Sequence, residues 1–314
     1  MKGFRRGAIA STGLAGGMGT PGLHSYWRIN ITANNGDGSN VTSGKVYMYN
    51  DFDRINKAIG GTPVGSGAGV SGNVLANSFN YADANIDSIW IEAGTSGYIG
   101  YHFASPVEIN GIFVRARHTA LTQMLKDFSI DYSDDGSSWT QAWSETGKLF
   151  PDIHQGLFSW NPAYVPSYTG SKIAAVRYWR TSCYVHTADT FTCAEQELAL
   201  TPAGSDETGS GTASASNQTF GAASNAYDNN NTTFWAPASS NFQWLKYDFG
   251  SGVTKAIAEM RWKSRSVGSP GQNPKVAEFQ FSADDSLWHP AWIINDGVTW
   301  TDGMQKTFLD PKYV

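Results

Sequence analysis

A repeat of about 150 residues constrains this chain more than any other feature of its sequence. The triplet YWR at 26–28 returns at 178–180, and SDDGSSW at 133–139 returns as SADDSLW at 282–288. Other pairs follow in the same order at spacings of 145 to 152 residues, a drift expected when loops gain or lose residues. The 314 residues are therefore predicted to hold two copies of one folding unit, each long enough to bury its own core.

Short segments in both copies alternate apolar and polar residues. At 128–132 and at 277–281 every second residue is apolar, which is the period of a half-buried strand. Turn formers such as DDG at 134–136 separate these segments. The composition, with 13% aromatic and only 16% charged residues, suits a β-rich protein. We therefore predict an all-β fold of two tandem antiparallel β-sandwich jelly rolls.

The repeated triplet opens a predicted strand whose residues divide between two faces. Trp27, Ile29 and Ile31 are expected to face inward, and Arg28 to lie on the opposite face. The inward residues of the second copy are Trp179, Thr181 and Cys183. The triplet is thus interpreted as a marker of where each copy begins, not as a binding motif.

The two cysteines are predicted to be core residues. Cys183 replaces an inward-facing Ile, and Cys193 corresponds to Val41 at the same spacing of 152 residues. A chain of this size has enough core to fold without a covalent crosslink, and free cysteine behaves as a small hydrophobic residue. We favour a buried reduced pair, and a disulfide is the alternative.

Four segments of the second copy carry a family resemblance. Residues 226–235 (AYDNNNTTFW), 243–250 (QWLKYDFG) and 279–288 resemble the AFDGN–TTFW segment, the W-L-x-h-D-F/L-G strand and the S-x-D-G-x-x-W hairpin of discoidin domains. The triplet at 178–180 with Glu197-Leu198 resembles their late strand pair. These domains, also called coagulation-factor type C domains, have a galactose-binding-like jelly roll, and several carbohydrate-binding modules share that fold. The resemblance covers most of 22–314 and is weaker in the first copy.

The order of the motifs departs from that of ordinary discoidin domains. There the Y-h-R strand closes the domain, whereas here it precedes the rest of each copy. We favour a circularly permuted jelly roll in which each strand pair folds onto the core that follows it, since jelly-roll termini often lie close together. The alternative, an ordinary domain at about 52–200 between incomplete pieces, would leave sheet edges unpaired. The predicted plan is an arm at 1–21 and jelly rolls at 22–173 and 174–314.

The phrase YWRINITANNG at 26–36 resembles repeat modules of tailed-phage virion proteins. The resemblance implies a virion protein, made in the host cytoplasm, that serves as tail fibre, baseplate, adhesin or head decoration. Its expected partners are other virion proteins, further copies of itself and host cell-surface glycan. The alternative is a secreted bacterial protein with carbohydrate-binding modules that accompanies a separate enzyme. Residues 1–21 are too poor in large aliphatics for a good signal peptide, so we interpret them as a flexible or docking arm.

Other function classes find little support in the sequence. A formal net charge of −5 disfavours nucleic-acid binding, and no apolar run approaches the roughly 20 residues of a membrane span. The six histidines are scattered without ligand spacing, and no nucleophile or phosphate-loop motif is present. The paired acids at 134–135 and 284–285 are interpreted as turn residues. We predict a non-enzymatic protein, with a glycosidase or lyase of unrecognised motif as the alternative.

The family resemblance implies a structural calcium ion as a cofactor of the second copy. Asp228, Asn231 and Thr233 match the loop that often binds calcium, and Glu197 matches the family's late Glu. Carboxylate, amide and hydroxyl oxygens suit this hard cation. The alternative is an Asn/Asp-rich turn satisfied by its own backbone.

The first copy is a poorer candidate for calcium. Lys45 stands where we place the late Glu, so a cation occupies a ligand position, although Asp83 and Asp87 remain in the preceding loop. Calcium is therefore expected in the second copy rather than the first.

Candidate ligand-binding residues are sought in the loops that differ between the copies, because sugar sites need aromatic faces and polar side chains at one end of the sandwich. The tryptophans at shared positions are predicted to be core, namely Trp90, Trp139, Trp235 and Trp288. The candidates outside that pattern are Arg117, His118 and Trp160 in the first copy, and Arg265 and Asn273 in the second.

Overall fold

The computed structural model divides the chain into two compact units by its internal contacts. Unit 1 comprises Met1–Asn50, Lys57–Phe79 and Ile89–Val165, and unit 2 comprises Asp51–Asn56, Asn80–Ser88 and Pro166–Val314. The structure describes residues 21–50, 55–82, 88–117, 120–150, 155–159, 173–185, 191–238, 243–267, 270–274, 276–295 and 300–310. The predicted N-terminal arm therefore lies almost entirely outside the described residues.

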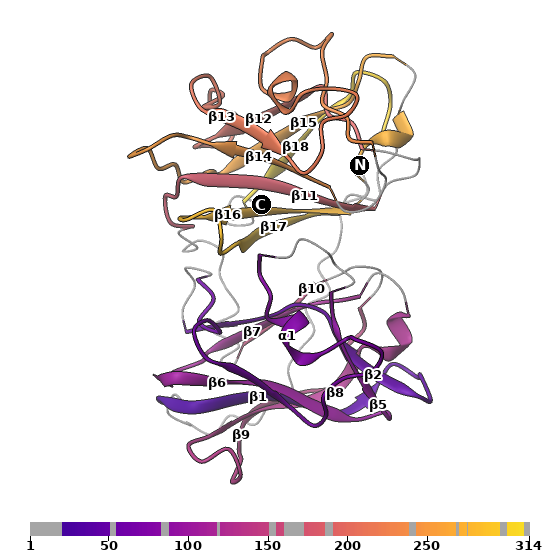
Figure 1. Ribbon diagram of the computed structural model, residues 1–314, viewed down its shortest axis with the longest axis vertical. Helices are drawn as coiled ribbons and strands as arrows, with labels where there is room; N and C mark the ends of the chain where they lie inside the picture. The colour runs from indigo at the N-terminus through magenta and orange to yellow at the C-terminus, as the bar shows by residue number, and fades with distance from the viewer. Residues whose placement is uncertain are drawn as a thin grey trace. The chain divides into compact units, whose positions relative to one another are not determined.

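Unit 1 is a sandwich of antiparallel sheets (Figure 1). Its strands are β1 (His24–Asn34), β2 (Asn40–Ser43), β3 (Val46–Tyr49), β4 (Thr62–Gly65), β5 (Trp90–Ala93), β6 (Gly97–Val107), β7 (Gly111–Arg115), β8 (Leu125–Ser133), β9 (Thr140–Glu145) and β10 (Gln155–Ser159). The main sheet has the order β4-β6-β1-β8-β9, the facing sheet has the order β10-β7-β3, and β2 pairs with β5. Its short helices are α1 (Leu75–Ser78) and the 3₁₀ turn η1 (Leu121–Gln123).

Unit 2 repeats this plan with its own strands (Figure 1). They are β11 (Tyr178–Val185), β12 (Glu195–Ala199), β13 (Thr212–Ala215), β14 (Gln243–Asp248), β15 (Glu259–Lys263), β16 (Val276–Ser282), β17 (His289–Asn295) and β18 (Gln305–Leu309). The five-stranded sheet has the order β13-β14-β11-β16-β17, and the three-stranded sheet has the order β12-β15-β18. Its described residues include the 3₁₀ turns η4 (Ala223–Ala226) and η5 (Pro270–Gln272). The predicted all-β antiparallel sandwich is confirmed.

The strand that begins with the repeated triplet lies at the centre of the large sheet in each unit. β1 is hydrogen-bonded between β6 and β8, and β11 between β14 and β16, all of which follow it in the chain. Trp27 and Trp179 are fully buried, and each indole N–H donates to a backbone carbonyl at 3.0 Å, that of Val107 or Lys255. Each triplet strand therefore pairs with the core that follows it, which is the permuted order favoured from the sequence.

The inner faces of the strands form the cores. Trp90 and Trp235 are fully buried, as predicted, and so are Ile29 and Ile31. Cys183 and Cys193 are both buried and free, which confirms the reduced pair. Burial raises the pKa of the Cys183 thiol far above its ordinary value, so this thiol stays protonated at neutral pH.

Trp139 corrects one prediction, because it is only half-buried. It lies on the outer face, with the guanidinium of Arg28 4.0 Å from its ring centroid. Trp288, which is buried as predicted, holds Arg180 in the same way at 4.1 Å. The hairpin tryptophan covers the triplet arginine and not the apolar interior, which a period-two pattern cannot reveal.

The strand registers also correct two equivalences between the copies. Ser43 pairs with Trp90 as Cys193 pairs with Trp235, so the counterpart of Cys193 is Ser43 and not Val41. The spacing here is 150 residues, not the 152 of the triplet, because the connection after the first strand is two residues shorter in unit 2.

The same register reassigns Lys45. The Lys45 carbonyl accepts the N–H of Arg115, which pairs with Gln155 on β10. In unit 2, Glu195 pairs with Lys263, which pairs with Gln305 on β18. The counterpart of Lys45 is therefore Glu195, and not Glu197 as the sequence comparison assumed.

Candidate functional site

A tight loop follows η4 in unit 2 and carries most of the predicted calcium residues. Asp228 accepts the Asn230 N–H at 2.9 Å with one carboxylate oxygen and the Thr233 hydroxyl at 2.8 Å with the other. Asn229 has a φ of 56°, in the left-handed region that Asn tolerates better than most residues. Asn231 lies exposed in the same turn. The loop thus brings Asp228, Asn231 and Thr233 into one turn, and calcium binding by these residues stays a prediction.

Among the described residues, no hydrogen bond or ion pair joins the side chain of Glu197 to this loop. Glu197 lies on β12, where Nη1 of Arg261 donates to its carboxylate at 2.6 Å. Arg261 lies on β15, the strand that pairs with β12, and also forms an ion pair with Glu259 of its own strand. The carboxylate of Glu197 therefore already has a cation in the structure.

Glu195, two residues earlier, is the carboxylate that sequence reasoning missed. Its side chain is 3% exposed, and neither carboxylate oxygen has a hydrogen-bond partner among the described residues. Burial, reinforced above all by the charge of Asp228, raises the pKa of Glu195 to about 8. The Asn230 N–H lies near enough to lower this pKa in part, but it is donated to Asp228 instead.

Strand β12 and the loop are directly connected. The hydroxyl of Tyr227, the residue before Asp228, donates to Gln196 at 3.1 Å, and Gln196 is the neighbour of Glu195. A buried carboxylate without hydrogen bonds is costly, and a bound cation would satisfy it. The sequence signal that could have identified Glu195 is the length of the connection after the first strand. It is two residues shorter in unit 2, which shifts the equivalent of Lys45 from Glu197 to Glu195.

The residues present fit a calcium ion. Glu195 and Asp228 offer carboxylates, Thr233 a hydroxyl, and Asn225 a backbone carbonyl that lies 3.5 Å from that hydroxyl. Calcium takes six to eight oxygen ligands, of which many are neutral. No group of three or more His, Cys, Asp or Glu side chains arranged to hold a metal occurs in the part of the chain that the structure describes. A site here would therefore depend on two carboxylates and several neutral oxygens.

A second candidate surface lies on the loops of unit 2 that flank the matched TTFW segment. The guanidinium of Arg265 lies 3.7 Å from the ring centroid of Phe234, and Phe220 is 64% exposed. The Phe220 N–H donates to the Ala236 carbonyl at 3.0 Å, so the two loops that carry the rings are joined. We call Phe220, Phe234 and Arg265 the aromatic loop surface.

The other predicted ligand residues have different positions. Asn273 is buried and accepts the indole N–H of Trp262 at 3.2 Å, so it supports its loop from within. Arg117 donates to Gln123 at 2.9 Å. His118 and Trp160 lie outside the described residues. Among the described residues of unit 1, the residue before the shared tryptophan is the buried Ile89, so the ring of Phe234 has no counterpart there.

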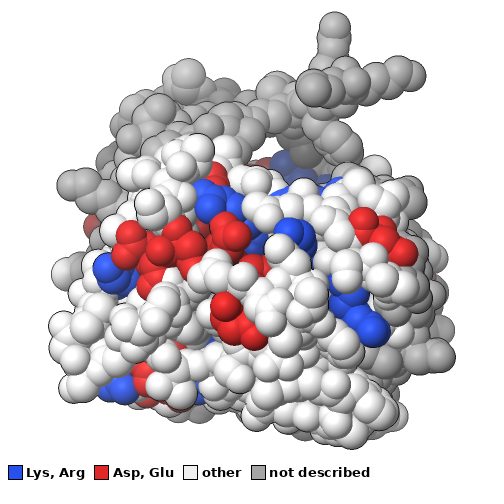
Figure 2. All heavy atoms as spheres, turned by 90° about the horizontal axis from the view of Figure 1, so that it is seen from above, with Lys and Arg blue, Asp and Glu red and all other residues white. Residues whose placement is uncertain are grey.

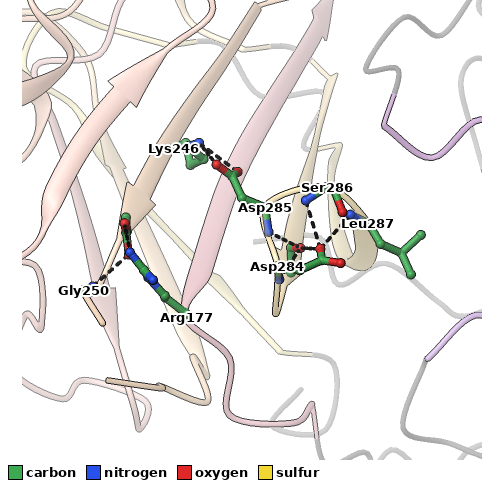
Figure 3. A network of polar contacts seen from close by, with 9 residues as sticks. Arg177, Lys246, Gly250, Asp284, Asp285, Ser286 and Leu287 are labelled. Carbon is green, nitrogen blue, oxygen red and sulfur yellow. Dashed lines mark hydrogen bonds and ion pairs between the residues drawn. The ribbon is translucent and has the colours of Figure 1, made fainter. Parts of the chain in front are cut away.

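The paired acids act in turns, as predicted. Asp135 accepts the N–H groups of Ser137 and Ser138, and Asp284 accepts those of Ser286 and Leu287 (Figure 3). Burial opposes the ionisation of Asp284, but these backbone donors outweigh it and lower its pKa to about 2. Both carboxylates are thus held ionised by their own turns and are poorly suited to carry a proton at neutral pH.

The remaining acids near this turn are ion-paired. Asp285 accepts Nζ of Lys246 at 2.6 Å, and Asp248 accepts Nε and Nη2 of Arg177 at 2.6 and 2.7 Å (Figure 3). Figure 2 shows acidic and basic side chains interspersed among uncharged ones on the face that it presents. Among the helices that the structure describes, none has the length and apolar character to span a membrane.

One comparison with known proteins identifies a module. Residues 210–312 match the model of the F5/8 type C domain. The matched part begins after β11 and β12 and includes β13 to β18, so the central strand of its sheet comes from the preceding segment. Unit 2 thus contains a discoidin-like module, of a class that binds rather than catalyses. Neither the curated proteins nor the solved structures gave a match.

Proposed function

We propose that the chain is a non-enzymatic phage virion protein whose second unit binds host cell-surface carbohydrate through the aromatic loop surface. The observation that carries the proposal is the stack of Arg265 on Phe234, next to a loop whose Phe220 is exposed and whose backbone is hydrogen-bonded to the Phe234 loop, within the F5/8 type C match. Apolar groups that gather on a surface with polar groups at their rim are typical of interaction sites.

The chemistry of this surface suits a sugar. The apolar face of a pyranose packs on an aromatic ring, while a guanidinium offers several N–H donors to the ring hydroxyls. Phe220 would supply the first contact and Arg265, held flat on Phe234, the second. The formal net charge of −5 favours a neutral ligand over a polyanion.

Calcium is proposed as a structural cofactor of the same unit. Glu195, Asp228, Thr233 and the Asn225 carbonyl would hold it, and the ion would fix the loop that leads into Phe234. Its contribution would be to neutralise the buried carboxylate and to order the turn, not to take part in a reaction. The unpartnered oxygens of Glu195 support this assignment.

A glycan array probed with the full chain tests the binding function. We expect Phe220→Ala and Arg265→Ala each to weaken binding roughly tenfold or more, since central aromatic and Arg contacts dominate such interfaces. Arg117→Ala, at the equivalent loop of unit 1, and Val267→Ala, an exposed residue near Arg265, are the matched controls. A folded protein that binds no host polysaccharide would leave only a role in virion assembly.

The virion assignment rests on the resemblance of residues 26–36 and needs a separate test. Mass spectrometry of purified particles should find the chain together with tail or head proteins, and tail genes should lie beside its gene. Assembly with those proteins and self-association are part of the proposal. A secreted carbohydrate-binding protein is the alternative, and cleavage of the first 21 residues in the mature protein would favour it. New reducing ends after incubation with host capsule would refute the non-enzymatic assignment.

A further inference from the structure

The two units place opposite charges at the same point of the fold. Lys45 and Glu195 occupy equivalent positions. Each comes two residues after the residue that pairs with the shared tryptophan, which is Ser43 in unit 1 and Cys193 in unit 2. The side chains of Lys45 and Glu195 are both buried, at 1% and 3% exposure. A buried charge normally has a partner of opposite charge or hydrogen bonds, so we compare the groups that surround the two side chains.

Lys45 lies against the loop of unit 1 that corresponds to the calcium loop proposed for unit 2. Its Nζ donates to the backbone carbonyl of Asn77 at 2.6 Å. Asn77 is the counterpart of Asn225, because each donates its side-chain amide at 3.1 Å to the carbonyl before the shared tryptophan, that of Ile89 or Phe234. The ammonium group therefore lies against the carbonyl whose counterpart is an expected calcium ligand in unit 2.

The two arrangements are complementary in charge. Unit 1 has a cation built into the strand and an oxygen that accepts from it. Unit 2 has a carboxylate at the same place, no hydrogen bond to either of its oxygens among the described residues, and the carbonyl of Asn225 nearby in the loop. An ammonium group and a calcium ion both require oxygen partners. Either cation can therefore bind the backbone carbonyl oxygen that this loop presents.

We propose that Lys45 supplies in unit 1 the positive charge that a calcium ion supplies in unit 2, so that the chain binds one calcium ion and binds it in unit 2. This inference rests on the calcium assignment of the proposed function. It adds that the first unit is independent of calcium and that the difference is carried by one residue.

Calcium titration of the full chain tests the stoichiometry. We expect one ion per chain in the wild type, none in Glu195→Gln, and one in Glu197→Gln, the matched control whose carboxylate is already paired with Arg261. Two ions per chain would overturn the role of Lys45 and leave the calcium assignment of unit 2 intact. No bound ion in the wild type would overturn both, and an ion retained by Glu195→Gln would overturn the ligand set.

Hydrogen exchange, read peptide by peptide with calcium or with a chelator, tests the substitution itself. In the wild type, calcium should slow exchange in peptides around 193–199 and 225–235 and leave those around 43–49 and 75–82 unchanged. Lys45→Met should speed exchange in the unit 1 peptides roughly tenfold or more, equally with and without calcium. Lys45→Glu should show the same loss in chelator and regain protection in calcium.

The comparison of the two Lys45 variants decides the matter. If calcium fails to protect Lys45→Glu more than Lys45→Met, the ion and the ammonium are not interchangeable and the proposal is wrong. If Lys45→Glu does not fold, calcium-dependent protection of the unit 1 peptides in the wild type would still refute the proposal, and its absence there, with one ion bound, would support it.

Discussion

The outer faces of the two large sheets carry different side chains although their strand registers match. In unit 1, Tyr26 stacks on His102 with ring centroids 4.1 Å apart, and Gly100 lies opposite Arg28. In unit 2 the residues opposite Tyr178 and Arg180 are Asp248 and Lys246, both in ion pairs (Figure 3). The register is the same, so the two units share a frame of strands, while these outward positions hold an aromatic stack in unit 1 and ion pairs in unit 2.

This contrast teaches where function can differ between the copies. The inward positions are constrained by packing, whereas outward and loop positions are free to acquire a ligand in one unit alone. At positions that the structure describes in both units, Phe234 of unit 2 corresponds to Ile89, and Glu195 of unit 2 corresponds to Lys45. A ligand found for one unit is therefore not expected to bind the other.

The largest effect should come from the residue that the units share at their centres. Trp27→Ala and Trp179→Ala should each destabilise their own unit by about 3–5 kcal/mol, because a large cavity replaces a fully buried indole. Denaturant unfolding with unit-resolved hydrogen exchange measures this loss. Trp139→Ala is the control, and a half-buried indole should cost clearly less. Equal losses for Trp139 and Trp27 would contradict its placement on the outer face.

A moderate effect should separate the outer faces. A Cβ at Gly100 would lie 2.3 Å from the Trp27 carbonyl oxygen, so Gly100→Ala must displace backbone and should cost about 1–3 kcal/mol. Its counterpart Lys246→Ala removes only a part-exposed ion pair and should cost less than about 1 kcal/mol. Chemical denaturation of the two variants checks the order. The reverse order would mean that the ion pairs, and not the close strand contact, hold these faces.

A smaller effect should be common to both units. Arg28→Lys and Arg180→Lys keep the charge but lose the flat stack on Trp139 and Trp288, and each should cost about 1 kcal/mol. A double-mutant cycle with Trp139→Leu isolates the stacking energy in unit 1. A coupling near zero would show that the arginine is held by Asp131, to which its Nε donates at 2.9 Å, and by the ring of Tyr98, and not by Trp139.

The arrangement of strands could be predicted from the sequence because it follows from local residue patterns. Period-two alternation and the repeat were enough to predict the sandwich, the inward face of the triplet strand and the buried cysteines, since each depends on which face a residue takes. Prediction failed where tertiary geometry decides. Trp139 turns out of the core to cover Arg28, and a shorter connection moves the Lys45 equivalence from Glu197 to Glu195.

The candidate site shows the same division. Asp228, Asn231 and Thr233 were predicted from a contiguous motif and do share one turn. Glu195 could not be selected from the run EQEL, because only pairing with β15 tells which glutamate is buried without a partner. Phe220 belongs to no repeated pattern, and its exposure follows from a loop conformation that propensity does not encode.

The smallest effect concerns the hairpin turns, which the two units share. The pKa of Asp284 is lowered to about 2, and that of Asp135 is lowered too, chiefly by the backbone N–H groups of Ser138 and Ser137. A carboxyl group whose folded pKa is depressed stabilises the protein above its unfolded pKa, and this stabilisation is lost as the pH falls through the folded pKa. Asp284→Asn should therefore lower the stability of unit 2 above pH ~4, by less than about 1 kcal/mol after solvent screening, and the difference from wild type should vanish below pH ~2.

Unfolding of wild type and variant between pH ~1 and pH ~6 measures this difference for Asp284→Asn, and Asp135→Asn repeats it in unit 1. Because both turns use the same backbone donors, the two difference curves should have the same shape, with that of Asp135 reaching zero at a lower pH. A difference that persists at pH 2 for Asp284→Asn would mean that the contact is steric and not ionic. Curves of unlike shape would place the divergence between the units in their turns as well as on their outer faces.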